Sequence, residues 1–390
     1  MRELRLILIS LVLVSLSGCL WPSVGMDPAR TAYNPYEDVL TVGNVSTLSQ
    51  AWTVPTGETT AVHAPSTFGT GVFFSTGTHL RAFEAANGAS RWTVDFGVNV
   101  AGDVAVAADG VYSQGPVIHT PGGGFDSVVK LAPSDGTLMW STNAGPLGGL
   151  SAPVVSGTNV YFGNWAAYAT SNGDEAAFGG SPAGIDPAAI GGGHVYSGVN
   201  VYDAAFAAGC SGTPKVCSAL WSYAPSATPT GPVYTSGAVF MGTSAGTVEA
   251  FDPNGCVSSP CAPLWTDVAA GSITAPPAVA NGVVFAGSSN GTLYAFDAAG
   301  CGSATCSPLW TASSGGAIKA QPSVAKSLVF FGSDDGKVYA ANATGCGSAT
   351  CSPLWSSAAG APVETQAAVA HGSVYVSRTD GSLTAYRVTG

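Results

Sequence analysis

The chain has 390 residues, of which 52 are glycine and 9 are cysteine, and only 9% are charged. Soluble domains carry roughly 25% charged residues, but the only continuous apolar run is short and N-terminal, so this deficit does not indicate membrane insertion. The net charge of −11 argues against a surface for nucleic acid or anionic lipid, which needs clustered Lys and Arg. The aromatic and β-branched content is too high for disorder, and the length suits one large or two medium domains.

The N-terminus has the organisation of an export signal. Arg2 and Arg5 precede an apolar run over residues 6–16, which is shorter than the roughly 20 residues of a transmembrane helix. The run ends in Leu-Ser-Gly-Cys, whose last residue is Cys19, and this sequence resembles the bacterial lipobox. The cysteine of a lipobox becomes the lipid-modified first residue of the mature chain, so the pattern predicts lipidation of Cys19. An ordinary signal peptide with an incidental cysteine is the alternative.

This interpretation divides the chain into three parts. Residues 1–18 are a lipoprotein signal peptide, residues 19–48 are a lipid-anchored tether and leader, and residues 49–390 are the folded domain. Within the leader, residues 20–34 are expected to be a tether between the lipid and the fold. The mature protein is therefore expected to be exported and lipid-anchored, on the outer face of the cytoplasmic membrane or in the periplasm or outer membrane.

The other eight cysteines fall into four local pairs. Three pairs have the spacing C-x4-C and one has C-x6-C; they are Cys256/Cys261, Cys301/Cys306, Cys346/Cys351 and Cys210/Cys217. An even set of local pairs on an exported chain predicts disulfides. Zinc is the competing interpretation, but zinc sites usually use C-x2-C doublets and often histidine, and no histidine lies near these pairs in the sequence.

The chain repeats itself with a period typical of propeller blades. Tryptophan marks the period, at Trp52, Trp92, Trp140, Trp221, Trp265, Trp310 and Trp355. One interval, between Trp140 and Trp221, is close to twice the others, which indicates a missing marker near residue 180. The sequence therefore contains eight units of about 40–45 residues.

The unit over residues 277–311 shows the expected local structure. Asn281 and Gly282 are a hairpin signal, because both residues accept the positive φ of a type I′ turn. Apolar and alternating segments around this turn predict short antiparallel strands, four to a blade. The sequence thus predicts an all-β fold, namely an eight-bladed β-propeller of four-stranded antiparallel blades, and no helical period is visible in the mature chain.

The two ends of the repeat array complement each other. The eighth unit stops without its Trp strand, whereas residues 51–54 form a Trp strand with no blade before it. We expect this N-terminal strand to close the last blade, because closure removes exposed edges. The cysteine pairs lie in the hairpin before the Trp strand, which is longer in those blades than in the first two. Each disulfide is therefore expected to tie a lengthened peripheral hairpin shut.

The run from Ala82 to Trp92 resembles the pyrroloquinoline-quinone-type (PQQ-like) propeller repeat, A-x-D-x-x-T-G-x-x-x-W, and residues 294–300 and 338–345 carry the same core. The resemblance covers nearly all of residues 27–390. The outer-membrane assembly lipoproteins of Gram-negative bacteria are similar in plan, with a lipobox, eight blades and comparable length. They are scaffolds, so the resemblance implies a non-catalytic role, although the cysteine hairpins and the low Lys content depart from their pattern.

The residues that could carry chemistry are few. Quinoprotein dehydrogenases bind the quinone beside Ca²⁺ and often cover it with a bridge between adjacent cysteines, and no Cys-Cys dipeptide occurs here. Two G-x-S-x-G matches, around Ser244 and Ser289, occupy the same turn of successive blades, so they indicate turn chemistry and not a nucleophile elbow. The five histidines lack metal-ligand spacing. Trp165 breaks the tryptophan series and is the one candidate ligand contact that we single out.

We therefore predict a cell-envelope lipoprotein that acts as a non-catalytic binding or scaffolding propeller. Its expected partners are proteins of the envelope and, through the anchor, the membrane; we expect no nucleic acid, no cofactor and a monomer. One alternative is a quinoprotein similar to PQQ-dependent alcohol or sugar dehydrogenases, which would need PQQ and calcium. The other is a carbohydrate-binding or carbohydrate-cleaving propeller.

Overall fold

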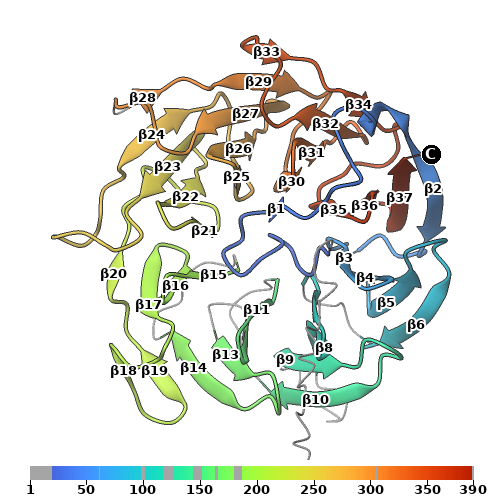
Figure 1. Cartoon of the computed structure of the whole chain (residues 1–390). Helices are drawn as coiled ribbons and strands as arrows, with labels where there is room; N and C mark the ends of the chain where they lie inside the picture. The colour runs from blue at the N-terminus through green and yellow to red at the C-terminus, as the bar shows by residue number, and fades with distance from the viewer. Residues whose placement is uncertain are drawn as a thin grey trace, which may run out of the picture.

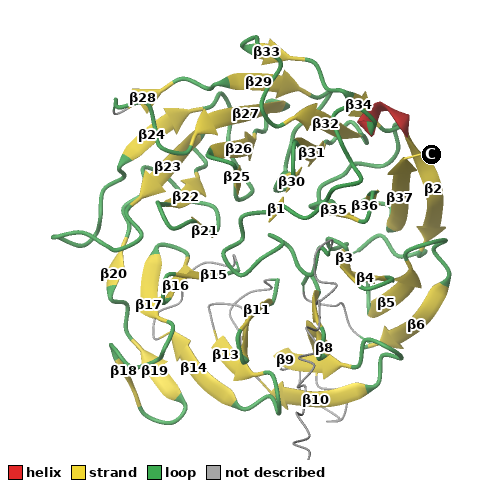
Figure 2. Cartoon of the chain, viewed as in Figure 1, coloured by secondary structure: helices red, strands yellow, loops and turns green. Residues whose placement is uncertain are grey.

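The computed structural model describes residues 20–60, 62–97, 102–116, 126–143, 152–162, 166–179, 187–303 and 305–388. These residues form a ring of eight β-sheets, or blades, around a central axis (Figure 1). The predicted all-β, eight-bladed propeller is confirmed. In the described residues the only helix is one short 3-10 segment, η1 (Val45–Thr47), which precedes the closing strand (Figure 2). No helix in these ranges is long and apolar enough to cross a membrane.

The blades follow one another along the chain, and each is built from the axis outward. The first four blades contain the following strands. Blade 1 has β3 (Ser66–Phe68), β4 (Gly71–Thr76), β5 (His79–Glu84) and β6 (Ser90–Asp95). Blade 2 has β7 (Ala105–Ala107), β8 (Gly110–Pro116), β9 (Asp126–Leu131) and β10 (Leu138–Asn143). Blade 3 has β11 (Val154–Ser156), β12 (Asn159–Phe162), β13 (Ala166–Ala169) and β14 (Glu175–Gly179). Blade 4 has β15 (Ala189–Gly191), β16 (His194–Ser197), β17 (Asn200–Asp203) and β20 (Trp221–Ser222).

The last four blades repeat this order, with the N-terminal strand β2 as the outermost strand of the eighth. Blade 5 has β21 (Val233–Tyr234), β22 (Val239–Gly242), β23 (Thr247–Phe251) and β24 (Trp265–Val268). Blade 6 has β25 (Ala278–Ala280), β26 (Val283–Gly287), β27 (Thr292–Asp297) and β29 (Trp310–Ser313). Blade 7 has β30 (Ser323–Ala325), β31 (Leu328–Gly332), β32 (Val338–Asn342) and β34 (Trp355–Ser356). Blade 8 has β35 (Ala368–Ala370), β36 (Ser373–Ser377), β37 (Ser382–Val388) and β2 (Leu48–Pro55).

The closing strand lies where the sequence predicts it. β2 pairs antiparallel with β37 over seven residue pairs, so the N-terminal strand forms the rim of the final blade (Figure 1). Trp52 of β2 packs against Tyr375, with ring centroids 5.9 Å apart. Its indole N–H donates to the carbonyl of Ala85 in blade 1 at 3.0 Å. The closing strand therefore completes blade 8 and also joins it to blade 1.

The four disulfides join the predicted neighbours, and their hairpins do more than was predicted. The bonds are Cys210–Cys217, Cys256–Cys261, Cys301–Cys306 and Cys346–Cys351. Three of these hairpins contribute a strand that runs parallel to the outermost strand of the preceding blade: β19 (Lys215–Cys217) on β14, β28 (Thr305–Cys306) on β24 and β33 (Thr350–Cys351) on β29. The fourth makes a single bridge between Cys261 and Tyr223 of blade 4. Each disulfide thus holds a clamp between two blades.

The missing tryptophan of blade 3 has a structural explanation. Ala177 of β14 pairs with Ala167 of β13, in the register where Trp92 pairs with Ala82 in blade 1. Ala177 and Cys217 are buried in one cluster, and Phe206 packs against this cluster; Cys217 and Phe206 both come from the hairpin of blade 4. The first disulfide clamp, which includes β18 (Cys210–Ser211), therefore occupies space that an indole ring fills elsewhere.

The leader is part of the fold. Residues 20–34 lie inside the ring, where their backbone carbonyls accept hydrogen bonds from the innermost strands of six blades (Figure 1). The donors are the amides of Thr67, Val106, Ile190, Tyr234, Val279 and Val324, at 2.7–2.9 Å. β1 (Tyr33–Asn34) adds a parallel strand to β30, and the Asn34 side chain donates to the carbonyl of Val369 in blade 8 at 3.0 Å. The expected tether over residues 20–34 is therefore wrong, because strand N–H groups that face the axis need acceptors and this segment supplies them.

Candidate functional site

The ring has two chemically different faces. We call the turn face the side that carries the hairpin turn between the first and second strand of each blade, such as Asn281-Gly282. We call the loop face the opposite side, where the chain passes from one blade to the next. The leader lies between the two, so each face has its own cavity at the axis. The loop-face cavity is polar and forms the candidate site.

This axial cavity has a volume of about 310 Å³. Its wall is made by the segments that precede the innermost strands of seven blades, and its lining includes His63, Asp103, Lys319, Glu364 and Gln366. Arg30 of the leader lines the cavity as well and is 1% exposed. The site therefore combines side chains from distant points of the sequence on one small surface, of a size that suits a small molecule or a single side chain of a partner.

Two clusters of ionisable side chains lie at this cavity. The Lys319 ammonium lies 2.7 Å from Glu364 Oε1 and 2.8 Å from Asp334 Oδ2, and the hydrogen bonds to Asp334 and Glu364 raise the pKa of Lys319. Across the cavity, Asp103 Oδ1 accepts a hydrogen bond from the amide of Ala64 at 2.5 Å and lies 4.0 Å from His63 Nδ1. Both clusters bridge neighbouring blades, so the cavity has the Lys319 ammonium and the carboxylates of Asp103 and Glu364 at fixed positions.

Amide side chains attach the leader to the bottom of the cavity. Gln366 Oε1 accepts from the Gly25 amide at 2.7 Å. Gln321 Nε2 donates to the carbonyls of Arg30 at 3.2 Å and Pro277 at 2.8 Å. The Arg30 guanidinium donates to the carbonyl of Pro187 at 3.0 Å. These contacts hold Arg30 of the leader in a fixed position against the surrounding blades. A binding site for a polar group requires side chains that are held in this way.

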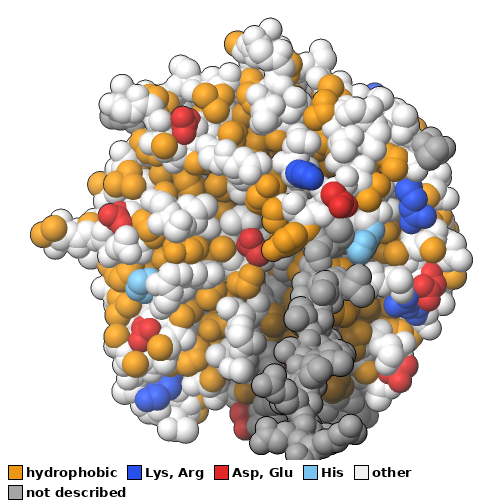
Figure 3. Space-filling model, viewed as in Figure 1, with side chains coloured by type: hydrophobic (Ala, Val, Ile, Leu, Met, Phe, Trp, Pro, Cys, Tyr) orange, Lys and Arg blue, Asp and Glu red, His pale blue; other side chains and the backbone are white. Residues whose placement is uncertain are grey.

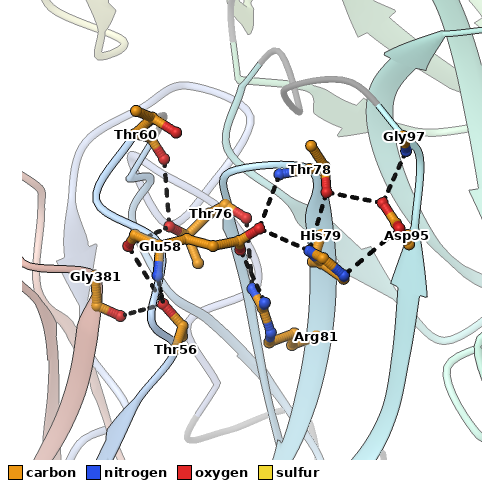
Figure 4. A network of polar contacts seen from close by, with 10 residues as sticks. All are labelled: Thr56, Glu58, Thr60, Thr76, Thr78, His79, Arg81, Asp95, Gly97 and Gly381. Carbon is orange, nitrogen blue, oxygen red and sulfur yellow. Dashed lines mark hydrogen bonds and ion pairs between the residues drawn. The ribbon is translucent and has the colours of Figure 1, made fainter.

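A second polar network lies on the loop face between blades 8 and 1 (Figure 4). Glu58 Oε1 lies 2.8 Å from His79 Nδ1, and Glu58 Oε2 lies 2.8 Å from Arg81 Nη2. Burial alone would raise the pKa of Glu58, but the hydrogen bonds from Arg81 and His79 outweigh it and hold the pKa below its usual value. Thr56 of the same segment donates to the Gly381 carbonyl at 2.8 Å, so the network fixes the loop after the closing strand to both blades.

The residues singled out from the sequence fall into three groups. Cys19 and Trp165 lie outside the described residues. Ser244 and Ser289 lie in turns that lead into strands, as their turn chemistry predicts. The eight paired cysteines lie in the peripheral clamps, far in sequence from the axial lining. None of these described residues lines the axial cavity.

The axial residues were not predicted. His63 is one of the five histidines whose spacing argues against metal binding, and no sequence pattern singles out Arg30, Asp103, Lys319 or Glu364. Their shared signal is positional, because four of them lie two to four residues before the innermost strand of their blade and recur at about the blade period or a multiple of it. Aligning the eight units on their first strands would have brought these positions together.

The described residues do not fit a quinone with calcium. Calcium takes six to eight oxygen ligands, whereas the two carboxylates that line the axial cavity, Asp103 and Glu364, are engaged by the Ala64 amide and by Lys319. Within the described ranges no group of three or more His, Cys, Asp or Glu side chains is arranged to hold a metal ion. We therefore derive no step through such a cofactor.

Comparison with known families and structures agrees with this fold. The profile of the family described as outer membrane protein assembly factor BamB matches residues 40–255 and 299–390. No curated protein matches the sequence. Among solved structures, the quinohemoprotein alcohol dehydrogenase of Comamonas testosteroni is 16% identical with a TM-score of 0.66, over 95% of this chain and 81% of that one. The corresponding enzyme ADHIIG of Pseudomonas putida is 14% identical with a TM-score of 0.67, over 95% and 80% of the two chains. The computationally designed protein Ika8 is 15% identical with a TM-score of 0.65, over 87% and 100%. At these identities the likeness shows the propeller fold alone.

Proposed function

The chain belongs to the family described as outer membrane protein assembly factor BamB, and from this premise we propose that it is an exported, lipid-anchored scaffold that binds protein partners of the cell envelope without catalysis. The anchor is Cys19, and the partners bind the loop face. We propose no cofactor for this role. The family match carries the proposal, because it extends over most of the propeller and the family description names a factor in outer membrane protein assembly.

The arrangement of the ring supports this assignment. The leader fills the axis between the two faces, so a partner has to bind a face or the rim. Inter-blade clamps and the closing strand make the ring a rigid platform. On the loop face, the axial cavity presents Lys319, Glu364 and His63 around the buried Arg30. These groups can recognise a charged or polar side chain of a partner, with electrostatic complementarity setting the specificity.

The test is co-purification from membranes with one variant on each face. Lys319→Ala removes a cation from the loop face, where it pairs with Glu364. Arg91→Ala is the matched control, because Arg91 makes a comparable ion pair with Glu84 at 2.8 Å and also contacts Thr70 in a turn of the turn face. We expect the wild-type protein and Arg91→Ala to retain the same partner and Lys319→Ala to lose most of it. Equal retention by both variants would contradict binding at the loop face.

A second measurement addresses catalysis directly. The purified protein is mixed with pyrroloquinoline quinone and Ca²⁺, and its absorbance and dye-linked alcohol oxidation are followed. We expect neither a cofactor spectrum nor turnover, because the axial carboxylates are already engaged. Turnover with a bound quinone would replace the scaffold assignment by that of a quinoprotein dehydrogenase.

A further inference from the structure

We propose that the turn face of the propeller lies against the surface of the lipid bilayer, held there by an anchor that leaves the fold at the ring axis. The inference rests on the proposed lipid anchor at Cys19 and adds the orientation of the protein on its membrane. The loop face with its axial cavity then points away from the bilayer.

The first described residue, Leu20, is fixed in the ring. Leu20 is 9% exposed and Trp21 is 1% exposed. The Trp21 amide donates to Thr67 Oγ1 at 2.7 Å, and the Trp21 carbonyl accepts from the Thr67 amide at 2.7 Å. Adjacent Cα atoms are about 3.8 Å apart. A lipid on the residue that precedes Leu20 is therefore joined to the ring without a spacer.

Leu20 lies toward the turn face. It lines an apolar cavity of about 270 Å³ together with Phe68 and Ala107, which are the last residues of β3 and β7 before their turn-face hairpins. Its carbonyl also accepts from the Asn34 side chain at 3.4 Å, and the Asn34 carbonyl accepts from the amide of Lys326 in the turn-face hairpin of blade 7. An anchor at this point leaves the disc near its centre. A centrally anchored disc with no slack has to rest on its face, whereas an anchor at the rim would let the disc stand upright.

The turn face also carries exposed apolar side chains. Tyr36, Val39 and Val42, which are 59%, 45% and 39% exposed, lie on the leader where it crosses from the axis to the rim. Farther out, four leucines are exposed at one repeated position beside the disulfide hairpins: Leu220, Leu264, Leu309 and Leu354. Figure 3 looks onto this face and shows apolar side chains spread between few charged ones. Such side chains are stabilised at the interface of a bilayer.

Charge does not drive this contact. Asp135, Asp174 and Asp297 are exposed in turn-face hairpins, and anionic headgroups would repel them. The chain as a whole has 23 acidic and 12 basic residues, so its net negative charge would also be repelled by anionic headgroups. The anchor and the apolar side chains therefore favour a zwitterionic surface, and the proposal commits to a bilayer of phosphatidylcholine as its probe.

Three exposed lysines allow the orientation to be measured without any substitution. Lys326 lies in the turn-face hairpin of blade 7 close to the leader, and Lys215 lies toward the turn face in the first clamp at the rim. Lys319 lies on the loop face. The full-length lipidated protein is labelled with a water-soluble amine reagent in phosphatidylcholine vesicles and in detergent, and each lysine is compared with itself by mass spectrometry.

We expect labelling of Lys326 and Lys215 to fall about five-fold or more on vesicles, because both amines would lie in the headgroup region, while labelling of Lys319 stays unchanged. Equal labelling of all three lysines on vesicles would overturn the proposal, and so would protection of Lys326 alone, since a tilted ring leaves the rim in water. The same digest reports the mass of the peptide that begins at Cys19. An unlipidated Cys19 would refute the anchor and the orientation together, whereas a lipidated Cys19 with unprotected lysines would refute the orientation alone.

A spacer variant tests the cause of the orientation. A flexible Gly/Ser segment of about 20 residues, inserted between Cys19 and Leu20, would allow a separation of some 25 Å. We expect Lys215 to regain its labelling in this variant, with the fold and the lipid unchanged. Protection of Lys215 that survives the spacer would contradict the role assigned to the short anchor.

Discussion

Replacing Trp52 by alanine should destabilise the whole ring, although this residue lies near the N-terminus. Trp52 is 9% exposed, packs on Tyr375 of blade 8, and donates its indole N–H to Ala85 of blade 1. Truncation of a buried tryptophan costs roughly 3–5 kcal/mol. We take about 3 kcal/mol for Trp52, because its indole lies at the rim of the propeller. An unfolding entropy of about 2.1 cal/mol/K per residue then converts this loss to a fall in Tm of about 4 °C for a domain of this size.

The assay is differential scanning calorimetry with a control on the same strand. Gln50 is an exposed neighbour of Trp52 on β2, so Gln50→Ala changes β2 without changing the blade interface and should leave Tm within about 1 °C of wild type. Removal of residues 49–56 goes further, because it removes the outer of the two strands that pair with β37 and leaves an open edge that favours aggregation. The argument for closure by β2 fails if Trp52→Ala has the same Tm as Gln50→Ala. It also fails if the protein without residues 49–56 keeps the stability of the wild type.

Three further changes test other parts of the fold. Asp267 is fully buried, and burial raises its pKa from 3.8 to about 6. The folded state therefore binds the extra proton below about pH 6 and loses that stabilisation as the pH rises, so Asp267→Asn should be more stable than wild type by about 1–2 kcal/mol at pH 7.5 and no more stable at pH 4 in urea unfolding. Replacement of Cys301 and Cys306 by serine should cost roughly 2 kcal/mol, and a non-reducing digest of wild type that links cysteines of different blades would contradict the clamp. Arg378 donates to the carbonyl of Ala361 at 3.0 Å and to the Tyr386 hydroxyl at 2.8 Å, so Arg378→Met should lower the free energy of unfolding by about 2–3 kcal/mol, and a loss below about 0.5 kcal/mol would show that these buried contacts add little.

The sequence predicted the blades because their signals are local. Turn residues such as Asn281 and Gly282 do adopt positive φ, at 52° and 77°, and recur with the blade period, so each hairpin could be identified from neighbouring residues alone. The closing strand was predictable for a similar reason, since an unpaired Trp strand at one end matched a missing one at the other. The local cysteine spacing also limited the disulfides to neighbours.

The leader could not be predicted in this way. Its contacts with the inner strands use backbone carbonyls, such as those of Pro22, Pro28 and Ala32. Any residue supplies a carbonyl, so these positions leave no pattern of side chains in the sequence. The parallel strands of the clamps were missed for the same reason, because β28 reaches β24 through backbone pairing between different blades. The axial cavity depends on both features, since it forms only when seven blades and the leader come together.

The position of the leader explains why the two faces differ. The apolar cavity beside Leu20 and the polar cavity beside Arg30 lie on opposite sides of one continuous segment. The same segment then crosses the turn face and becomes β2 at the rim, so it binds the ring at the axis and again at its outer edge. We expect a propeller that is held both at its axis and at its rim to resist opening. The contacts of the leader with the innermost strands and the pairing of β2 with β37 would both have to break before a blade is released. The two faces can therefore carry different side chains without loss of stability in the leader and blades between them. The turn face is apolar beside the start of the leader, and the loop face is charged beside Lys319 and Glu364.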